Sequence, residues 1–188
     1  MGSVTGRNHY HLSLTPYASS GWWLLVSVLL VSCTGIPPNV EPVENFELNR
    51  YLGTWYEIAR LDHSFERGLS HVTAQYSLRD DGGVKVVNRG FKADENAWKK
   101  ATGKAYFISD PDFGRLKVSF FGPFYGAYNI IALDRERYQY SLVCGPNRSY
   151  LWILSRSKNM DRAILERLIG KAKSLGFATE KLIFVRQD

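Results

Sequence analysis

The stretch "YLGTWYEIAR", residues 51–60, has the composition of a β-strand, because aromatic and β-branched residues make up half of it. It places Trp55 two residues after Gly53, at the start of the strand and not in its middle. The indole is the largest side chain in the stretch, and it stands near one end of the strand. The position therefore suggests a structural role at the end of a closed β-structure.

The chain from Tyr51 to Arg156 is a succession of short apolar runs separated by turn residues, which predicts an all-β architecture. One run alternates cleanly, with Val72, Ala74 and Tyr76 on one face. Turns such as "RDDGG" supply glycines between the runs. The predicted strands cover 51–60, 71–78, 84–91, 98–109, 114–121, 127–134, 138–144 and 150–156. Since the connections are short, neighbours in sequence should pair as antiparallel neighbours in space.

A single helix is predicted after these strands, over residues 159–176. Apolar residues recur there at helical spacing, Asp161 stands near the start and Gly176 just past the end. A last apolar run, 181–187, predicts a short ninth strand.

The eight main runs could form a sandwich or a barrel. We favour an eight-stranded antiparallel up-and-down barrel, because closure removes exposed sheet edges. A barrel of this size either fills itself with side chains or holds one small ligand.

Residues 1–32 are predicted to be a signal region that is removed. The apolar run 22–32 would span roughly 16 Å as a helix, about half of a bilayer core, so it suits a secretory signal and not a membrane span. The long polar stretch before it carries one firm positive charge, Arg7, which leaves the true translation start uncertain. "LVSC", residues 30–33, resembles a bacterial lipoprotein signal, which implies cleavage before Cys33 and lipid attachment there. Residues 33–45 would then be the lipidated cysteine and a proline-rich spacer.

Composition argues against several functions. The formal charge of +6 is scattered, and no basic run is interleaved with aromatics as nucleic-acid binding requires. His63 and His71 have no neighbouring cysteine, so we predict no metal or other cofactor. Asp80 and Asp81 sit in a glycine-rich turn, where a structural role is expected. Cys144 ends an apolar strand, and a buried inert thiol is favoured there over a catalytic nucleophile.

The ordered blocks "YLGTWYEIAR", "GKAYF", "VSFFGPFYGAYNIIALD" and "LVCGPNRSYLWILSR" resemble the bacterial lipocalins, the lipoprotein branch related to apolipoprotein D. "LDRERY" is a looser match to a second motif of the family. The resemblance covers roughly 46–186, within a barrel domain predicted over 46–188. It implies that Trp55 plugs the closed end of the barrel, with Arg156 across its face and Gly53 letting the chain turn in beneath it. An ordinary solvated strand end is the alternative for Arg156.

The candidate wall of a ligand cavity consists of apolar and aromatic residues at a period of two. They are Val72, Ala74, Tyr76, Val118, Phe120, Tyr128, Tyr150 and Trp152. Ala74, Ala101 and Ala105 would be small enough to leave space. Plain core packing or outer-face packing is the alternative for each, because one sequence does not fix which face points inward.

An acyl chain suits such a cavity, since burying about sixteen methylenes at roughly 0.8 kcal/mol each gives an upper bound of about 13 kcal/mol. The resemblance implies fatty acids such as palmitate, and lysophospholipids, as cargo for storage, transport or membrane upkeep. Thr34 after the cysteine implies the outer membrane of a Gram-negative bacterium, reached through the lipid anchor.

Two other functions stay open. The barrel could be packed and serve as an envelope structural or interaction module. It could also be a lipid isomerase that uses a cavity cysteine, although the position of Cys144 on a late strand argues against an enzyme. Some bacterial lipocalins pair as dimers, and the sequence leaves a homodimer open.

Overall fold

The computed structural model describes residues 1–2 and 34–188 of the chain. The predicted apolar signal run and Cys33 lie outside the described residues. None of the helices in the described part has the length and apolar character needed to cross a bilayer.

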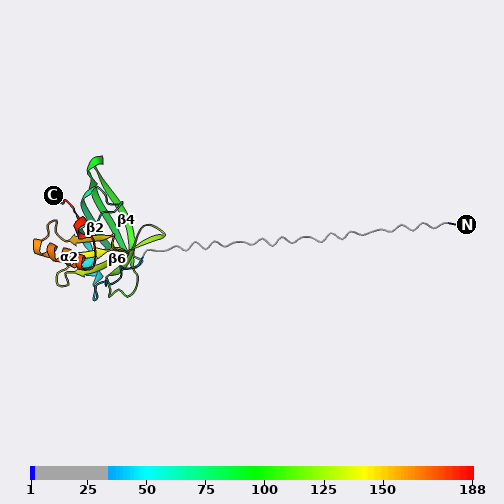
Figure 1. Cartoon of the computed structure of the whole chain (residues 1–188), viewed down its shortest axis with the longest axis horizontal. Coiled ribbons are helices and arrows are strands. Elements are labelled where there is room, and N and C mark those ends of the chain that lie inside the picture. The colour runs from blue at the N-terminus through cyan, green and yellow to red at the C-terminus, as the bar shows by residue number, and fades with distance from the viewer. Residues whose placement is uncertain (3–33) are drawn as a thin grey trace. The chain divides into compact units, whose positions relative to one another are not determined.

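The predicted antiparallel barrel is confirmed (Figure 1). The strands are β1 (Gly53–Arg60), β2 (Leu69–Leu78), β3 (Val84–Lys92), β4 (Ala97–Phe107), β5 (Arg115–Phe121), β6 (Phe124–Leu133), β7 (Tyr140–Cys144), β8 (Leu151–Ser155) and β9 (Ile183–Phe184). β2 to β8 pair in sequence order, β8 pairs with β1, and β1 pairs with β2, which closes the ring. The short β9 adds to the end of β1.

The helices are α1 (Leu48–Tyr51) and α2 (Arg162–Ser174), with two 3₁₀ turns, η1 (Ala93–Glu95) and η2 (Thr179–Lys181). α2 is shorter than predicted, because Asp161 caps its start by accepting hydrogen bonds from the backbone N–H groups of Ala163 and Ile164. Its end is marked by Gly176, which has a φ of 82°. α1 was not predicted, since four residues give no helical period.

Apolar side chains form two separate cores. The barrel core lies inside the closed end of the barrel and includes Trp55, Ile130 and Val143. The helix core lies between α2 and the outer face of the barrel and includes Leu142, Cys144 and Leu168. Successive residues of β7 and β8 therefore enter different cores, so apolar side chains lie on both faces of these strands.

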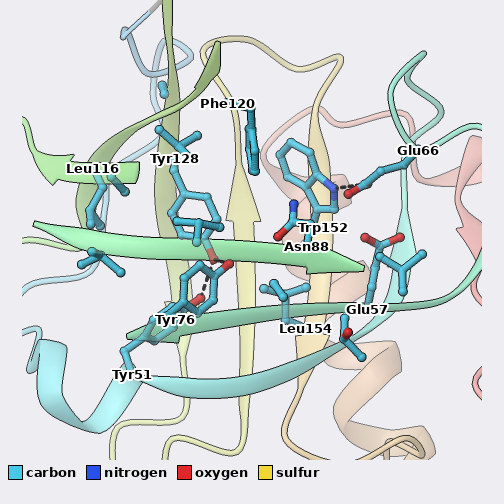
Figure 2. A pocket seen from close by; sticks show the side chains of 18 of the residues that line it. Tyr51, Glu57, Glu66, Tyr76, Asn88, Leu116, Phe120, Tyr128, Trp152 and Leu154 are labelled. Carbon is cyan, nitrogen blue, oxygen red and sulfur yellow. Dashed lines mark hydrogen bonds between the residues drawn. The ribbon is translucent and has the colours of Figure 1, made fainter. Parts of the chain in front are cut away.

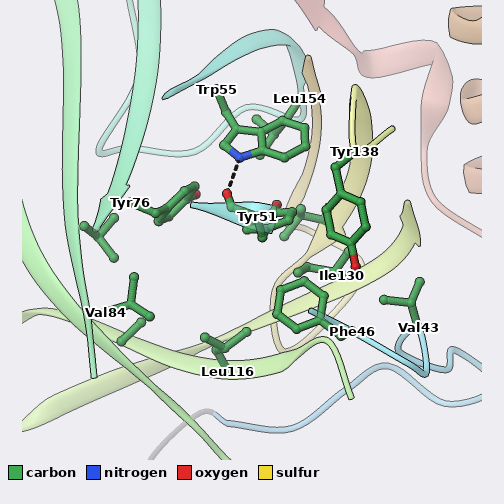
Figure 3. Close-up of a cluster of buried hydrophobic side chains, with 13 residues drawn as sticks. Val43, Phe46, Tyr51, Trp55, Tyr76, Val84, Leu116, Ile130, Tyr138 and Leu154 are labelled. Carbon is green, nitrogen blue, oxygen red and sulfur yellow. Dashed lines mark hydrogen bonds between the residues drawn. The ribbon is translucent and has the colours of Figure 1, made fainter. Parts of the chain in front are cut away.

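The closed end is built around Trp55, which is fully buried (Figure 3). Its indole Nε1 donates a hydrogen bond to the carbonyl of Tyr51, 2.8 Å away. Arg156 lies over the ring, with the guanidinium carbon 4.0 Å from the ring centroid. Arg156 also donates to the carbonyls of Arg50 (2.8 Å) and Thr54 (3.0 Å). Trp55 and Arg156 thus satisfy the carbonyls of Tyr51 and Arg50 at the end of α1, and Arg156 also bonds the start of β1 at Thr54.

Gly53 occupies the narrow space beside this arginine. Its φ is 97°, and a Cβ atom added there would stand 3.2 Å from Nη1 of Arg156. Glycine is required by both its conformation and its surroundings.

The segment 34–47 contains no strand or helix and packs against the barrel. Pro37 is fully buried, and Val40 and Val43 are buried as well. The carbonyl of Pro38 accepts a hydrogen bond from Arg148, and that of Gly35 accepts one from Asn129. The residues expected as a spacer are thus part of the folded body from Gly35 onward.

Candidate functional site

A cavity lies inside the barrel, with about 870 Å³ of empty space when the solvent at its mouth is included. The side chains that line it come from the N-terminal segment, α1, the β1–β2 loop and all described strands except β7 and β9 (Figure 2). They are Phe46, Leu48, Tyr51, Glu57, Phe65, Glu66, Val72, Thr73, Ala74, Tyr76, Val84, Val86, Asn88, Ala105, Leu116, Val118, Phe120, Ala127, Tyr128, Trp152 and Leu154. Most of this surface is aliphatic or aromatic, which suits an apolar ligand.

Three tyrosines form the polar part of the closed end of the cavity (Figure 2). The hydroxyl of Tyr128 lies 2.8 Å from that of Tyr51 and 2.9 Å from that of Tyr76. Tyr51 also lies 3.1 Å from Oγ of Ser141. Burial raises the pKa of Tyr51 to about 12 and the pKa values of Tyr76 and Tyr128 well above the usual value. The hydroxyls are therefore neutral and satisfy one another.

Two carboxylates lie at the other end, beside Trp152 and Asn88 (Figure 2). Glu57 accepts a hydrogen bond of 2.7 Å from the buried guanidinium of Arg60. Glu66 accepts one of 3.0 Å from the indole Nε1 of Trp152. Both carboxylates are almost completely buried.

A bulge in β1 explains how this group forms. The pairing of β1 with β8 shifts between Glu57 and Ala59, so Arg60 comes to pair with Trp152. Paired residues share a face of the sheet, which turns Arg60 to the inner side with Glu57. Without the bulge, strict alternation would place these two residues on opposite faces.

His63 completes the group from behind Glu66. Its Nε2 lies 2.9 Å from Oε2 of Glu66. The contact is electrostatic and not a well-aligned hydrogen bond, because neither ring nitrogen of His63 has a partner in suitable geometry. The ring stacks on Phe65, with 3.9 Å between centroids.

The two carboxylates differ in pKa. Burial raises the pKa of Glu57 well above its usual value, the charge of Glu66 adds to this, and Arg60 offsets it only in part. Burial also opposes ionisation of Glu66, but His63, Trp152 and Arg60 outweigh it and lower the pKa of Glu66. Glu57 is therefore the member of the pair that holds a proton more readily.

Of the eight residues predicted from the sequence as a ligand wall, seven line the cavity. They are Val72, Ala74, Tyr76, Val118, Phe120, Tyr128 and Trp152. Tyr150 is not among the lining residues; its ring lies beside those of His63 and Trp152. Of the three alanines considered, Ala74 and Ala105 line the cavity, whereas Ala101 is exposed and does not.

The sequence analysis did not identify Glu57 or Glu66. Glu57 carried a usable signal, because it lies two residues after the buried Trp55 and therefore on the same face of β1. Glu66 lies in the β1–β2 loop, where no periodicity indicates direction.

Two features of the described residues bear on catalysis and metal binding: the buried thiol of Cys144 and the arrangement of side chains that could bind a metal ion. Cys144 belongs to the helix core and not to the cavity wall, and burial raises its pKa to about 12. A thiol with this pKa is a poor nucleophile. Among the described residues, no group of three or more His, Cys, Asp or Glu side chains is placed to hold a metal ion.

An eight-stranded barrel that is sealed at one end and encloses an apolar cavity defines a class of binding proteins for small hydrophobic molecules. The lipocalin-like domain model matches residues 46–187. The chain therefore belongs to the lipocalin family.

Bacterial relatives share more than half of their aligned residues with this chain. The outer membrane lipoprotein Blc of Vibrio cholerae is 57% identical over 165 residues, which cover 88% of this chain and 96% of that protein. The protein of the same name from Escherichia coli K12 is 55% identical over 161 residues, with 85% and 90% covered.

A more distant sequence relative and a solved structure are also similar to this chain. Apolipoprotein D of Cavia porcellus is 31% identical over 156 residues, covering 80% of this chain and 82% of that protein. Insecticyanin from the tobacco hornworm Manduca sexta matches in structure with a TM-score of 0.65 and 23% identity, over 80% of this chain and 86% of that one. This last likeness shows the fold alone.

Proposed function

We propose that the protein is a lipid-anchored lipocalin of the outer membrane of a Gram-negative bacterium, which stores or carries single-chain lipids. Fatty acids and lysophospholipids are the cargo classes. The observation that carries the proposal is the enclosed apolar cavity, whose length runs from the tyrosine cluster to the buried carboxylates. The names of the two Blc relatives support the location.

Single-chain lipids fit better than two-chain lipids on energetic grounds. A membrane offers a buried acyl chain about the same free energy as an apolar cavity does, roughly 0.8 kcal/mol per methylene. A lipid with one chain leaves the membrane readily, because one chain anchors only marginally. The same argument predicts that two-chain phospholipids stay in the bilayer.

Native mass spectrometry tests the carrier role. The chain from Thr34 to Asp188 holds every strand and both cores, so it is suitable when purified from a Gram-negative host without added lipid. A retained mass that matches a fatty acid or a lysophospholipid supports the proposal. An empty protein that also takes up neither lipid on incubation contradicts it and favours a structural module.

A pair of variants on one strand makes this test specific for the cavity. Ala105 is buried and lines the cavity, so Ala105→Phe should block uptake of lipid. Thr102 lies on the same strand, is exposed and does not line the cavity, so Thr102→Phe should leave uptake unchanged. Equal uptake by both variants would place the lipid elsewhere on the protein.

The anchor is tested separately in the full-length chain. We expect the mature protein to begin at Cys33 and to carry acyl groups on that residue. Cys33→Ser should move the protein from the membrane fraction to the soluble fraction. Membrane association of an unmodified Cys33→Ser protein would contradict the anchor.

A further inference from the structure

The charged side chains that line the cavity are unusual for a protein that carries fatty acids. Among the described lining residues there is no lysine, arginine or histidine, and the carboxylic acids are Glu57 and Glu66. The one guanidinium nearby, that of Arg60, is buried behind Glu57 and is not part of the lining. A fatty-acid anion would therefore meet two carboxyl groups and no cation.

We infer that the end of the cavity beside Glu57 and Glu66 binds an ammonium group, so that the cargo is a single-chain amphiphile with a cationic nitrogen in its head and not a free fatty acid. This inference rests on the proposed carrier function and narrows its cargo.

One oxygen of each carboxyl group is held in place by neighbouring side chains. Arg60 fixes Oε1 of Glu57, and Trp152 and His63 hold Oε2 of Glu66. The two carboxyl groups also hydrogen-bond to each other through the proton that Glu57 holds, so a cation that displaces this proton would lie between two fixed acceptors. Preorganised acceptors of this kind favour a positive charge or a donor.

The surrounding walls suit an ammonium group as well. Phe65 and Trp152 line the cavity beside the carboxylates, with 6.5 Å between their ring centroids. Aromatic faces attract cations, and aromatic walls are the usual surroundings of bound alkylammonium groups. Asn88 adds a buried amide oxygen that has no hydrogen-bond partner and lines the same space.

Binding of a cation here should release a proton. Three titratable or charged groups act on Glu57: Glu66, Arg60 and the hydroxyl of Tyr76 from β2. His63 contacts Glu66 instead. Burial and Glu66 favour the protonated form of Glu57 in the empty cavity. When an ammonium group enters, Glu57 loses its proton to solvent. One positive charge enters and one proton leaves, so the total charge in the cavity is unchanged.

The test compares three ligands with the same ten-carbon tail, below their micelle concentrations: decyltrimethylammonium, 1-decanol and decanoate. Dissociation constants come from isothermal titration calorimetry with the chain from Thr34 to Asp188 at neutral pH. We expect the ammonium to bind about tenfold or more tightly than decanoate, a difference typical of a desolvated cation site. Titration in two buffers of different ionisation enthalpy should show up to one proton released per ammonium and none per decanol.

Matched variants assign the preference to the carboxylates. Glu57→Gln and Glu66→Gln should each reduce the ammonium preference by about tenfold and leave decanol binding within about twofold. Glu180→Gln removes the same charge from an exposed surface site and should change neither value. Thermal unfolding checks that the variants are folded. The order of the three dissociation constants and the number of protons released are measured on the unaltered protein, so they do not depend on the variants.

The outcomes separate this inference from the carrier function. If decanol binds but decanoate binds as tightly as the ammonium, the ammonium site is wrong and the carrier function stands. If none of the three ligands binds, both fail.

Discussion

The guanidinium of Arg156 and the indole of Trp55 stack 4.0 Å apart although the two residues are a hundred positions apart in the sequence. Arg156 ties three backbone segments together at this point, since it also donates to the carbonyls of Arg50, Thr54 and Tyr138. The first and the last strands of the barrel are thus joined at the sealed end by one side chain.

Replacement of this arginine should destabilise the barrel. We expect Arg156→Ala to lower the free energy of unfolding by about 2–4 kcal/mol, because it removes a cation–π contact and the donor of these three carbonyls. Urea unfolding followed by intrinsic fluorescence measures this. Arg137→Ala, at an exposed arginine, is the control and should cost less than about 0.5 kcal/mol. Equal losses in both variants would show that the stack contributes nothing specific.

Two glycines should respond to alanine with opposite signs. Gly53→Ala should destabilise the protein by about 1–3 kcal/mol, since a φ of 97° and Nη1 of Arg156 at 3.2 Å both oppose a Cβ atom. Gly170 lies exposed in α2 with open space around its Cα, so Gly170→Ala should stabilise the protein by about 0.5–1 kcal/mol. Thermal and urea unfolding of the two variants compare these effects. A stabilised Gly53→Ala protein would refute the geometry given for the closed end.

The pKa of Glu57 has a consequence for stability. The folded protein retains the proton of Glu57 above the usual glutamate value of 4.5, whereas the unfolded chain releases it. This group therefore contributes stability that is fully present below pH 4.5 and is lost as the pH rises toward the folded pKa. Glu57→Gln, which stays neutral, should remove this loss, so its stability relative to the unaltered protein should increase with pH. Urea unfolding between pH 4 and 8 tests this, and parallel curves would contradict the raised pKa.

Cys144 should resist chemical modification in the folded state. Raising its pKa from 9.0 to about 12 makes the thiolate about a thousandfold rarer at pH 8. In a chain that starts at Thr34, Cys144 is the one remaining cysteine of the two in the sequence. We expect iodoacetamide to label it only when urea unfolds the protein. Rapid labelling of the native protein would place the thiol at an accessible site.

The sequence predicted the barrel because its turns, strand periods and distal motifs all agree on one architecture. The resemblance to the family placed Trp55 at the closed end, and the period of two grouped the candidate wall residues on one face without fixing whether that face points inward. The sequence did not predict how β1 turns Arg60 inward, because a bulge changes the period within the strand and leaves no composition signal. Glu66 was missed because a loop has no period, and Tyr150 was misplaced because it precedes β8 by one residue.

The packed segment before the barrel limits how far an anchored form of the protein could reach. The chain is fixed to the barrel from Gly35 onward, by hydrogen bonds to the carbonyls of Gly35 and Pro38 and by burial of Pro37. A lipid on Cys33 would be separated from Gly35 by two residues, or about 7 Å of extended chain. Such a protein would diffuse laterally in the plane of one membrane leaflet and could not cross the aqueous space to another membrane. Delivery between two membranes would then require a second carrier that is free of any anchor.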